Sequence, residues 1–198
     1  MRHGQSEWNS QQRWQGWIDV PLTALGEAQA RARGLELAGG GVDAPVVFAS
    51  DLVRARRTAD IIAEHLGAGV VTDERLRERH GGEWQGHTAA EIDELWPGWR
   101  ERWGKREVAA PPGGESDDAV LDRFDTALVD VLAATPAEQD AIIVTHGGML
   151  RLLAARTGIT SRDVVSNLGG HWFRHDGDTL VADEPLPPLS QDGALKVE

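Results

Sequence analysis

The sequence predicts an α/β protein with three layers, in which helices cover both faces of a mostly parallel central sheet. Short, continuous apolar runs at residues 45–50, 70–72 and 142–145 are typical of strands buried on both faces. Segments with helical periodicity separate these runs, and this alternation is the pattern of parallel sheets. We expect a single domain over residues 1–184 and a loose tail over 185–198.

Caps and glycines mark the first two helices. One helix is predicted from its cap Thr23 to about Ala38, where three glycines follow. Its inner face should carry apolar residues at helical spacing, namely Leu25, Ala28, Ala32 and Leu35. A second helix should follow Ser50, which can cap it, and should end at Gly67.

Three further helices and a hairpin are predicted. Thr88 opens a short helix with a capping box, and Ser116 starts a long amphipathic helix to about Ala134. The third follows His146-Gly147-Gly148 and should end near Gly158. A hairpin turned by Asp176-Gly177 should come near the end, and metal binding by its histidines is disfavoured. The tryptophans between these helices are predicted to cover a core: Trp96, Trp99 and Trp103.

Composition excludes several classes of function. The 198-residue chain has a formal net charge of −12, which disfavours nucleic acid and anionic membranes as partners. It has no cysteine, so disulfides, thiolate nucleophiles and cysteine metal sites are excluded. No stretch approaches the roughly 20 apolar residues that span a bilayer. We expect a cytoplasmic protein with a small-molecule partner, and a homodimer is compatible with the sequence.

Side chains suited to phosphate chemistry follow two of the predicted strands. Arg54 falls in the first helical turn after the first strand, and His146 directly follows the third. Open parallel sheets bind ligands at this edge, and a helix N-terminus there favours anions. The Arg2-His3-Gly4 turn would join them if it too lay at a strand end.

Such a set of side chains could transfer a phosphoryl group. Neutral imidazole is a good nucleophile, and arginine binds two phosphate oxygens without losing its charge. Phosphoryl transfer needs mainly positioning and charge neutralisation, which two arginines, two histidines and a carboxylate can supply. The sequence lacks the Gly-x-x-x-x-Gly-Lys and His-Glu-x-x-His motifs. We therefore expect no cofactor and no metal.

Eight ordered segments carry a family resemblance. They are Arg2-His3-Gly4 with Asn9, Gln15-Gly16-Trp17, Leu22-Thr23 with Gly26, Ser50-Asp51-Leu52 with Arg54-Ala55 and Thr58-Ala59, Leu76-Arg77-Glu78, Gly82-Glu83-Trp84-Gln85-Gly86, Gly113-Gly114-Glu115-Ser116, and Thr145-His146-Gly147-Gly148. This set resembles the motifs of the histidine phosphatase superfamily, also called the phosphoglycerate mutase-like family. The resemblance covers nearly the whole chain.

The resemblance implies a role for each site residue. His3 would take the phosphoryl group as a phosphohistidine, and its oxygens would be held by Arg2, Arg54 and His146. Glu78 would protonate the leaving alcohol and then act as base for the attacking water, with Glu83 in the same loop as the nearest competitor. The substrate approach would be lined by Asn9, Gln15, Gly16 and Gly147.

Within the family, the sequence favours the phosphatase branch. Mutases of the family that the chain resembles have a large insertion and a tyrosine-containing loop after the acid residue. Here the loop after Glu78 is short, its Gly-Glu-Trp-Gln-Gly segment resembles the phosphatase form, and the chain has no tyrosine. The prediction is a hydrolase of small phosphomonoesters, with sugar or phosphoglycerate esters favoured. Two alternatives stay open: a cofactor-dependent phosphoglycerate mutase and a phospho-ligand binder without catalysis.

The start of the chain departs from the family pattern. In the family that the chain resembles, an apolar central strand precedes the Arg-His-Gly turn, whereas only Met1 precedes Arg2 here. Without that strand, two neighbouring strands have unpaired edges and His3 lacks a rigid support. We expect either that the natural reading frame begins upstream of Met1 or that this form is less stable and less active than its parent.

Overall fold

Three parallel strands form the central sheet: β1 (Val46–Ala49), β2 (Val70–Thr72) and β3 (Ala141–Val144). β1 lies in the middle, in the order β2-β1-β3. Each strand coincides with a predicted apolar run. The computed structural model describes residues 1–42, 46–160, 165–176, 179–186 and 189.

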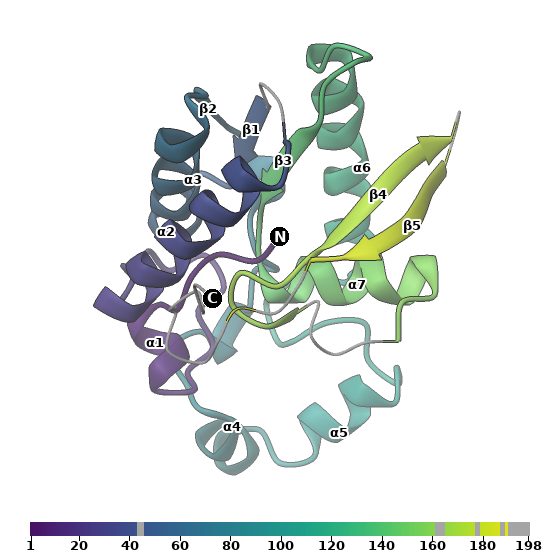
Figure 1. Ribbon diagram of the computed structural model, residues 1–198. Coiled ribbons are helices and arrows are strands. Elements are labelled where there is room, and N and C mark those ends of the chain that lie inside the picture. Colours follow the sequence, from purple (N-terminus) through teal and green to yellow (C-terminus); the bar gives the residue numbers. More distant parts are fainter. Residues whose placement is uncertain (43–45, 161–164, 177–178, 187–188, 190–198) are drawn as a thin grey trace.

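Helices cover both faces of this sheet (Figure 1). α2 (Ala24–Gly39) and α3 (Val53–Leu66) lie on one face, and α6 (Asp117–Ala134) and α7 (Gly147–Thr157) lie on the other. The predicted three-layer α/β/α fold is confirmed. No helix in the described part of the chain has both the length and the apolar character that a membrane span requires.

Alternate residues of each strand enter the two cores, because successive side chains of a strand point to opposite faces. Phe48 pairs with Val71 and with Ile143 in the parallel register, and it packs against α6 and α7. Its neighbours Val47 and Ala49 pack on the other face, against α3. The sheet is therefore buried on both sides, as continuous apolar runs predict.

The predicted inner face of α2 is wrong. Of the predicted stripe only Ala32 is fully buried, and Leu35 is 53% exposed. The helix instead packs closely on α3 through Gly34, where a Cβ would meet the ring of His65. Small residues that allow close approach therefore decide which face is buried, rather than the spacing of the larger apolar residues. The buried residues of α2 are Gly26, Ala30, Ala32, Arg33, Gly34 and Leu37.

The start of α3 also differs from the prediction. Its N-cap is Leu52, which makes no side-chain capping bond, and Ser50 lies two residues earlier. Ser50 Oγ instead accepts a hydrogen bond from the Leu52 N–H (3.3 Å). The predicted ends at Gly67 and Gly158 are confirmed, since both glycines have the left-handed backbone that ends a helix (φ of 66° and 77°).

Short elements form the lower part of the molecule in Figure 1, beyond the carboxyl ends of the strands. They are α1 (Glu7–Ser10), the 3-10 turns η1 (Glu74–Leu76) and η2 (Gly82–Trp84), α4 (Ala89–Leu95) and α5 (Trp99–Gly104). The predicted capping box at Thr88 opens α4. Trp96, Trp99 and Trp103 are half-buried, and it is Trp84 that is completely buried among the tryptophans.

β4 (His171–Asp176) and β5 (Thr179–Pro185) form the predicted antiparallel hairpin. Its predicted turn continues into Gly177, which lies outside the described residues. The segment 185–198, expected to be a loose tail, begins in packed structure. Pro185 ends β5, and Leu186 is 7% exposed in the core beside α3. Residues 187–188 and 190–198 of that segment lie outside the description.

Residues 1–3 pair with backbone on both sides, so the expectation that His3 lacks a rigid support is wrong. The Thr145 N–H donates to Met1 O (2.8 Å), and the His3 N–H donates to Thr145 O (3.0 Å). On the other side, the Arg2 N–H donates to Gly169 O (2.9 Å) and Leu168 N–H donates to Arg2 O (3.1 Å). The Arg-His-Gly turn is thereby held next to β3.

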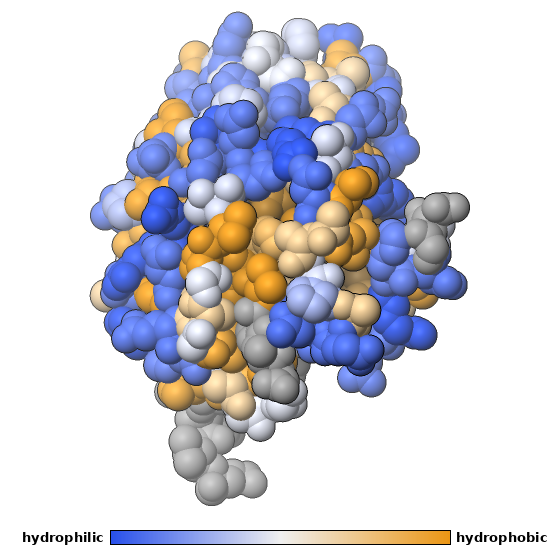
Figure 2. Space-filling view, turned by 90° about the horizontal axis from the view of Figure 1, so that it is seen from above, coloured by the Kyte–Doolittle hydropathy of each residue, from blue (hydrophilic) through white to orange (hydrophobic). Residues whose placement is uncertain are grey.

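A groove of about 730 Å³ extends from Met1 along the edge of β3. Ala141 and Ile143 of β3, Leu128 of α6 and Trp172 of β4 are among its walls. Figure 2 views the molecule from the amino ends of the strands and shows hydrophobic residues gathered inside a hydrophilic rim. Among the described residues, β3 pairs on this side only with the segment at Met1.

The Met1 amino group is buried at the end of this groove and donates to Ile143 O (2.7 Å). Burial, and secondarily the charge of Arg33, lowers its pKa to about 5. A segment ahead of Met1 would replace this amine by an amide, which carries no charge to desolvate.

Adding about five apolar residues, such as a Val/Leu run, before Met1 should raise the melting temperature. The added residues would pair with β3 in the groove, and about 1 kcal/mol of stabilisation raises the melting temperature by roughly 2–4 °C in a domain of this size. A Gly/Ser extension of equal length is the control, because it cannot fill the apolar groove. Equal melting temperatures for the two extended proteins would contradict the prediction.

Candidate active site

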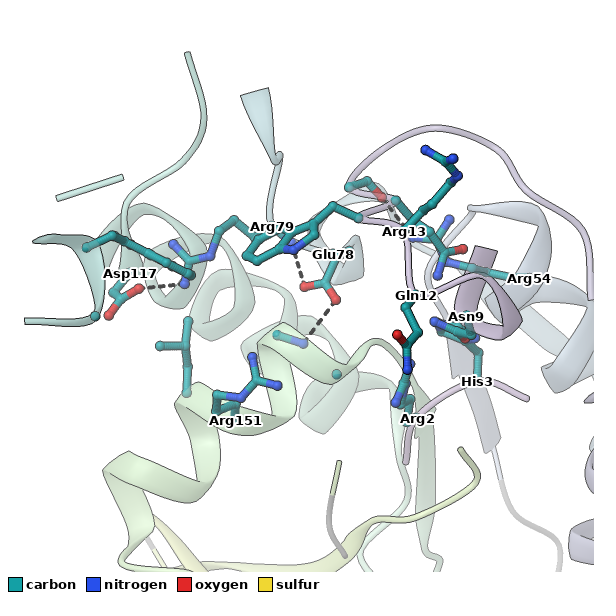
Figure 3. A pocket seen from close by; sticks show the side chains of 18 of the residues that line it. Arg2, His3, Asn9, Gln12, Arg13, Arg54, Glu78, Arg79, Asp117 and Arg151 are labelled. Atoms are coloured by element: carbon teal, nitrogen blue, oxygen red, sulfur yellow. Dashed lines mark hydrogen bonds and ion pairs between the residues drawn. The ribbon is translucent and has the colours of Figure 1, made fainter. Parts of the chain in front are cut away.

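A cavity of about 530 Å³ opens beyond the carboxyl ends of β1 and β3 (Figure 3). Eight of the nine predicted site residues line it: Arg2, His3, Asn9, Gln15, Gly16, Arg54, Glu78 and Gly147. The ninth, His146, is fully buried behind them, with its ring centroid 5.1 Å from that of His3. The fold therefore brings the whole predicted set together.

The ring of His3 is fixed in one tautomer. Its Nδ1 lies 2.7 Å from Gly4 O, and because a carbonyl oxygen can only accept, Nδ1 carries the proton and Nε2 the lone pair. Burial, followed by the positive charges of Arg54 and Arg2, lowers the pKa of His3 well below its usual 6.5. At neutral pH His3 is thus an uncharged imidazole with one nucleophilic nitrogen.

The turn that carries His3 is clamped from several directions. The Gly4 N–H donates to Thr58 Oγ1 (3.0 Å), and the Thr58 hydroxyl donates to Arg54 O in α3 (2.7 Å). Asn167 Nδ2 donates to His3 O (3.0 Å). Because a Cβ at Gly4 would clash with a backbone carbonyl of α2, this position requires glycine.

His146 offers unused hydrogen-bonding capacity at the base of the cavity. Neither ring nitrogen has a partner among the described residues, and both are buried. Burial, and then the charge of Arg54, lowers the pKa of His146 well below 6.5. Leaving a buried polar group unpaired costs about 1–3 kcal/mol. The ring nitrogen that carries the proton is therefore suited to donate to a bound ligand oxygen.

Arg2 and Arg54 place two positive charges at the cavity. Arg54 Nη1 and Nη2 donate to Ile18 O (3.0 Å) and Gly16 O (2.8 Å), and Arg2 Nη1 donates to Val165 O (2.7 Å). Both Nε atoms are buried without a partner among the described residues. Burial lowers the pKa of Arg54 to about 10, so its guanidinium remains charged at neutral pH.

Two backbone amides hold the carboxylate of Glu78. Oε1 accepts from the Arg79 N–H (2.8 Å), and Oε2 accepts from the Gly148 N–H (3.0 Å) at the start of α7 (Figure 3). Glu83 is exposed, accepts from Trp96 Nε1 (3.1 Å), and is absent from the cavity lining. Of these two glutamates, which belong to the same loop, only Glu78 lies at the cavity.

The remaining predicted residues line the side of the cavity and contact the residues next to it. Gln15 Oε1 accepts from Ser6 Oγ (2.8 Å), and Asn9 Oδ1 accepts from the Ser6 N–H (3.2 Å). Gly16 has a φ of 51°, and a Cβ there would clash with Gln85. The start of α7 lies against Arg2, because a Cβ at Gly147 would be 3.3 Å from Arg2 Nε.

Sequence reasoning missed the support of the Glu78 loop. Arg123 of α6 donates to the carbonyls of Arg75, Arg77 and Glu78 and pairs with Glu115 (3.0 Å). The sequence signal that could have revealed this support is Arg123 itself, a charged residue within the apolar pattern of α6, seven residues after the Gly-Gly-Glu-Ser segment. The cavity wall also contains residues that no motif singled out: Arg13, Trp14, Arg79, Trp103, Arg106 and Arg151.

The described residues contain no group of three or more histidine, aspartate or glutamate side chains arranged to hold a metal ion. Six of the eight aspartate, glutamate and arginine side chains that line the cavity are arginines, which suit an anionic ligand. This set of donors fits a phosphoryl group better than a divalent cation.

Comparison with known proteins agrees with this geometry. The family model of the histidine phosphatase superfamily (branch 1) matches residues 1–167. The chain belongs to this superfamily. Both the family and the type of enzyme expected from the sequence motifs are thereby confirmed.

Relatives include phosphatases and mutases. The chain is 38% identical over 162 residues to a glucosyl-3-phosphoglycerate phosphatase of Mycobacterium tuberculosis, covering 78% of this chain and 72% of the relative. It is 35% identical over 176 residues to a 2,3-bisphosphoglycerate-dependent phosphoglycerate mutase of Methylobacterium sp., covering 82% and 81%. A solved structure of mycobacterial glucosyl-3-phosphoglycerate phosphatase with VO3 is similar, with a TM-score of 0.73, 35% identity and coverage of 92% and 94%.

The free energy of unfolding should fall as the pH is lowered from about 6.5 toward 5. The folded-state pKa values of His3 and His146 lie well below 6.5, so in this range the unfolded chain binds protons that the folded protein does not. The loss approaches about 1.4 kcal/mol per pH unit for each histidine. Urea unfolding at several pH values measures it. The His3→Asn/His146→Asn double variant should show a shallower decrease, and equal slopes would refute the assignment.

Proposed function

We propose that this protein hydrolyses phosphomonoesters of small metabolites through a phosphohistidine on His3. The environment of His3 is the observation that supports this most. A neutral imidazole with its lone pair on Nε2 lies beside two charged arginines and the unpaired nitrogens of His146. A phosphate group supplies the oxygens that these donors lack, and it gains charge stabilisation from the guanidinium groups.

In the first step, His3 Nε2 attacks phosphorus and forms a P–N bond while the bond to the ester oxygen breaks. Arg2, Arg54 and His146 hold the three remaining phosphoryl oxygens during this transfer. Glu78 in its protonated form gives its proton to the departing oxygen, which leaves as the free alcohol. Two backbone amides hold the Glu78 carboxylate at the cavity, which supports this role.

In the second step, water attacks the phosphohistidine. The Glu78 carboxylate accepts a proton from the water as the new P–O bond forms and the P–N bond breaks. The bond electrons return to His3 Nε2, and inorganic phosphate leaves. Glu78 thereby regains the proton that the first step used, and the cycle closes.

The cavity also favours a substrate of the sugar or phosphoglycerate type. Trp14 and Trp103 contribute aromatic surface to its wall, and their ring centroids are 5.7 Å apart. Aromatic faces pack against the apolar C–H face of a sugar, while arginines bind acidic groups. Relatives named as glucosyl-3-phosphoglycerate phosphatases support the same class.

A mutase is the second candidate, because similar relatives are named as phosphoglycerate mutases. It would transfer the phosphoryl group from His3 to a second oxygen of the organic substrate rather than to water. Release of free phosphate, compared with formation of an isomer in the presence of 2,3-bisphosphoglycerate, distinguishes the two. A phospho-ligand binder without catalysis would give neither product.

We also propose that the reaction needs no metal ion, since arginines at the site can neutralise the phosphoryl charge. The cytoplasmic location, the lack of nucleic-acid and membrane partners, and a homodimer stay predictions from the sequence.

His3→Ala should abolish phosphate release from a panel of small phosphomonoesters, because no other group in the cavity can form the P–N bond. The wild-type protein should lose little activity in EDTA. Acid-labile, base-stable labelling by a ³²P-labelled substrate checks the intermediate, and His175→Ala is the control on an exposed histidine of β4. Complete loss of wild-type activity in EDTA would overturn the metal-independent mechanism.

Glu78→Gln should reduce kcat/KM by about 10²–10⁴-fold for alkyl phosphates and far less for p-nitrophenyl phosphate, which needs no proton to leave. Gly148→Ala should act in the same direction, because the added Cβ would displace the Glu78 carboxylate. Gly39→Ala is its control, with nothing within 4 Å of the added Cβ. A selective loss in Glu83→Gln, but not in Glu78→Gln, would reverse the assignment.

A further inference from the structure

Two arginines in the cavity are not accounted for by phosphoryl transfer. Six arginines and two acidic residues line the cavity, although the chain's net charge is −12. Arg2 and Arg54 serve the phosphoryl site, and two more are neutralised by carboxylates, at Glu91 (2.9 Å) and Asp117. The two that remain are Arg106 and Arg151.

These two arginines are exceptional in the described part of the chain. Every other described arginine side chain forms a hydrogen bond or an ion pair with the protein. An acidic protein offers many carboxylates to an arginine on its surface. Both unpaired guanidinium groups nevertheless lie at the same cavity. This indicates that they bind a ligand there rather than only water.

Arg151 has the better-defined position of the two. It lies on the eleven-residue helix α7, three residues after Gly148 and four after Gly147, so it shares their helix face. Gly148 N–H holds the Glu78 carboxylate, and the positive charge of Arg151 contributes to lowering the pKa of Arg2, after burial. Figure 3 shows Arg151 extending from α7 toward the cavity that Glu78 and Arg2 also enter.

Arg106 lies in the segment after α5, exposed at the rim of the cavity. Its φ of 60° is unusual for a residue other than glycine. A side chain on this segment is less firmly placed than one on a long helix packed against the sheet, so the specific contact is assigned to Arg151.

We propose that Arg151 binds a second anionic group, a carboxylate or a phosphate, on the leaving alcohol of the substrate. This inference rests on the proposed phosphatase function and names the substrate class. The ester oxygen must lie near Glu78 to receive its proton, and Arg151 is three residues, a rise of about 4.5 Å, along α7 from Gly148, which holds Glu78. An acidic group two or three bonds from the ester oxygen spans about this distance and can receive both guanidinium N–H groups.

Matched pairs of substrates test this assignment. 3-Phosphoglycerate and glycerol 3-phosphate differ by a carboxylate in place of a hydroxymethyl group, and 1,3-propanediol bisphosphate and its monophosphate differ by the second phosphate. Phosphate release at constant ionic strength gives kcat/KM for each, and the two ratios show which acidic group is preferred. p-Nitrophenyl phosphate serves as the reference without a second anion.

Arg151→Gln should lower kcat/KM for the preferred anionic substrate about 10- to 100-fold, the usual effect of one charge-assisted contact. Activity on the matched substrate without the second anion, and on p-nitrophenyl phosphate, should change less than about threefold. Arg151→Lys should recover part of the preference. Arg156→Gln is the control, because it removes the same charge from the same helix at a residue paired with Asp125 outside the cavity.

The assignment to Arg151 is overturned if both substrate ratios are the same in wild type and Arg151→Gln, or if Arg106→Gln abolishes the preference and Arg151→Gln does not. A wild-type protein that hydrolyses none of these esters would refute the proposed function separately. Calorimetric binding to the His3→Ala variant then still decides the inference. The ratio of affinities for 3-phosphoglycerate and glycerol 3-phosphate should fall when Arg151→Gln is added, and an unchanged ratio would refute it.

Discussion

The active site depends on the backbone pairing that holds residues 1–3 between β3 and the segment at Leu168–Gly169. Four hydrogen bonds fix this strand end, and the side chains of Arg2 and His3 project from it. An error of about 1 Å in such a position can lower a rate about a hundredfold. The pairing therefore matters more than the local Arg-His-Gly sequence, which occurs by chance in many proteins and becomes a site only at this place in a sheet.

The second requirement is a concentration of positive charge in an acidic protein. The fold buries Arg54 with both terminal nitrogens on loop carbonyls rather than in a direct ion pair, so its guanidinium can still attract an anionic ligand. Burial, followed by the same charge, lowers the pKa of His3 and of His146 well below 6.5, so both rings are neutral at neutral pH. One arrangement thus suits both parts of the proposed reaction, because it favours binding of a phosphate dianion and leaves His3 a free lone pair. The carbonyl partners also orient the guanidinium without weakening its attraction for an anion.

The sequence was sufficient to predict features that local patterns determine. Apolar runs located all three strands of the sheet, and the motifs located the eight predicted residues that line the cavity together with His146 behind them. The predictions failed where long-range packing decides. Small residues on α2 allow a different face of this helix to pack against α3. Arg123 supports the Glu78 loop from α6, and no local sequence pattern connects these two segments. The position of Arg151 at the cavity could not be predicted, because arginines are common on the polar face of an amphipathic helix and the sequence does not show what they contact.

The clamp on His3 also has a consequence for biosynthesis. The segment that carries Arg2 and His3 is synthesised well before the residues that hold it, because its partners Val165, Asn167 and Gly169 lie more than 160 residues later in the chain. A chain still emerging from the ribosome carries His3 without the backbone that orients it. Contacts of such high sequence separation form late and slow the folding of a domain. The proposed phosphoryl transfer at His3 therefore requires a chain that has been synthesised beyond Gly169.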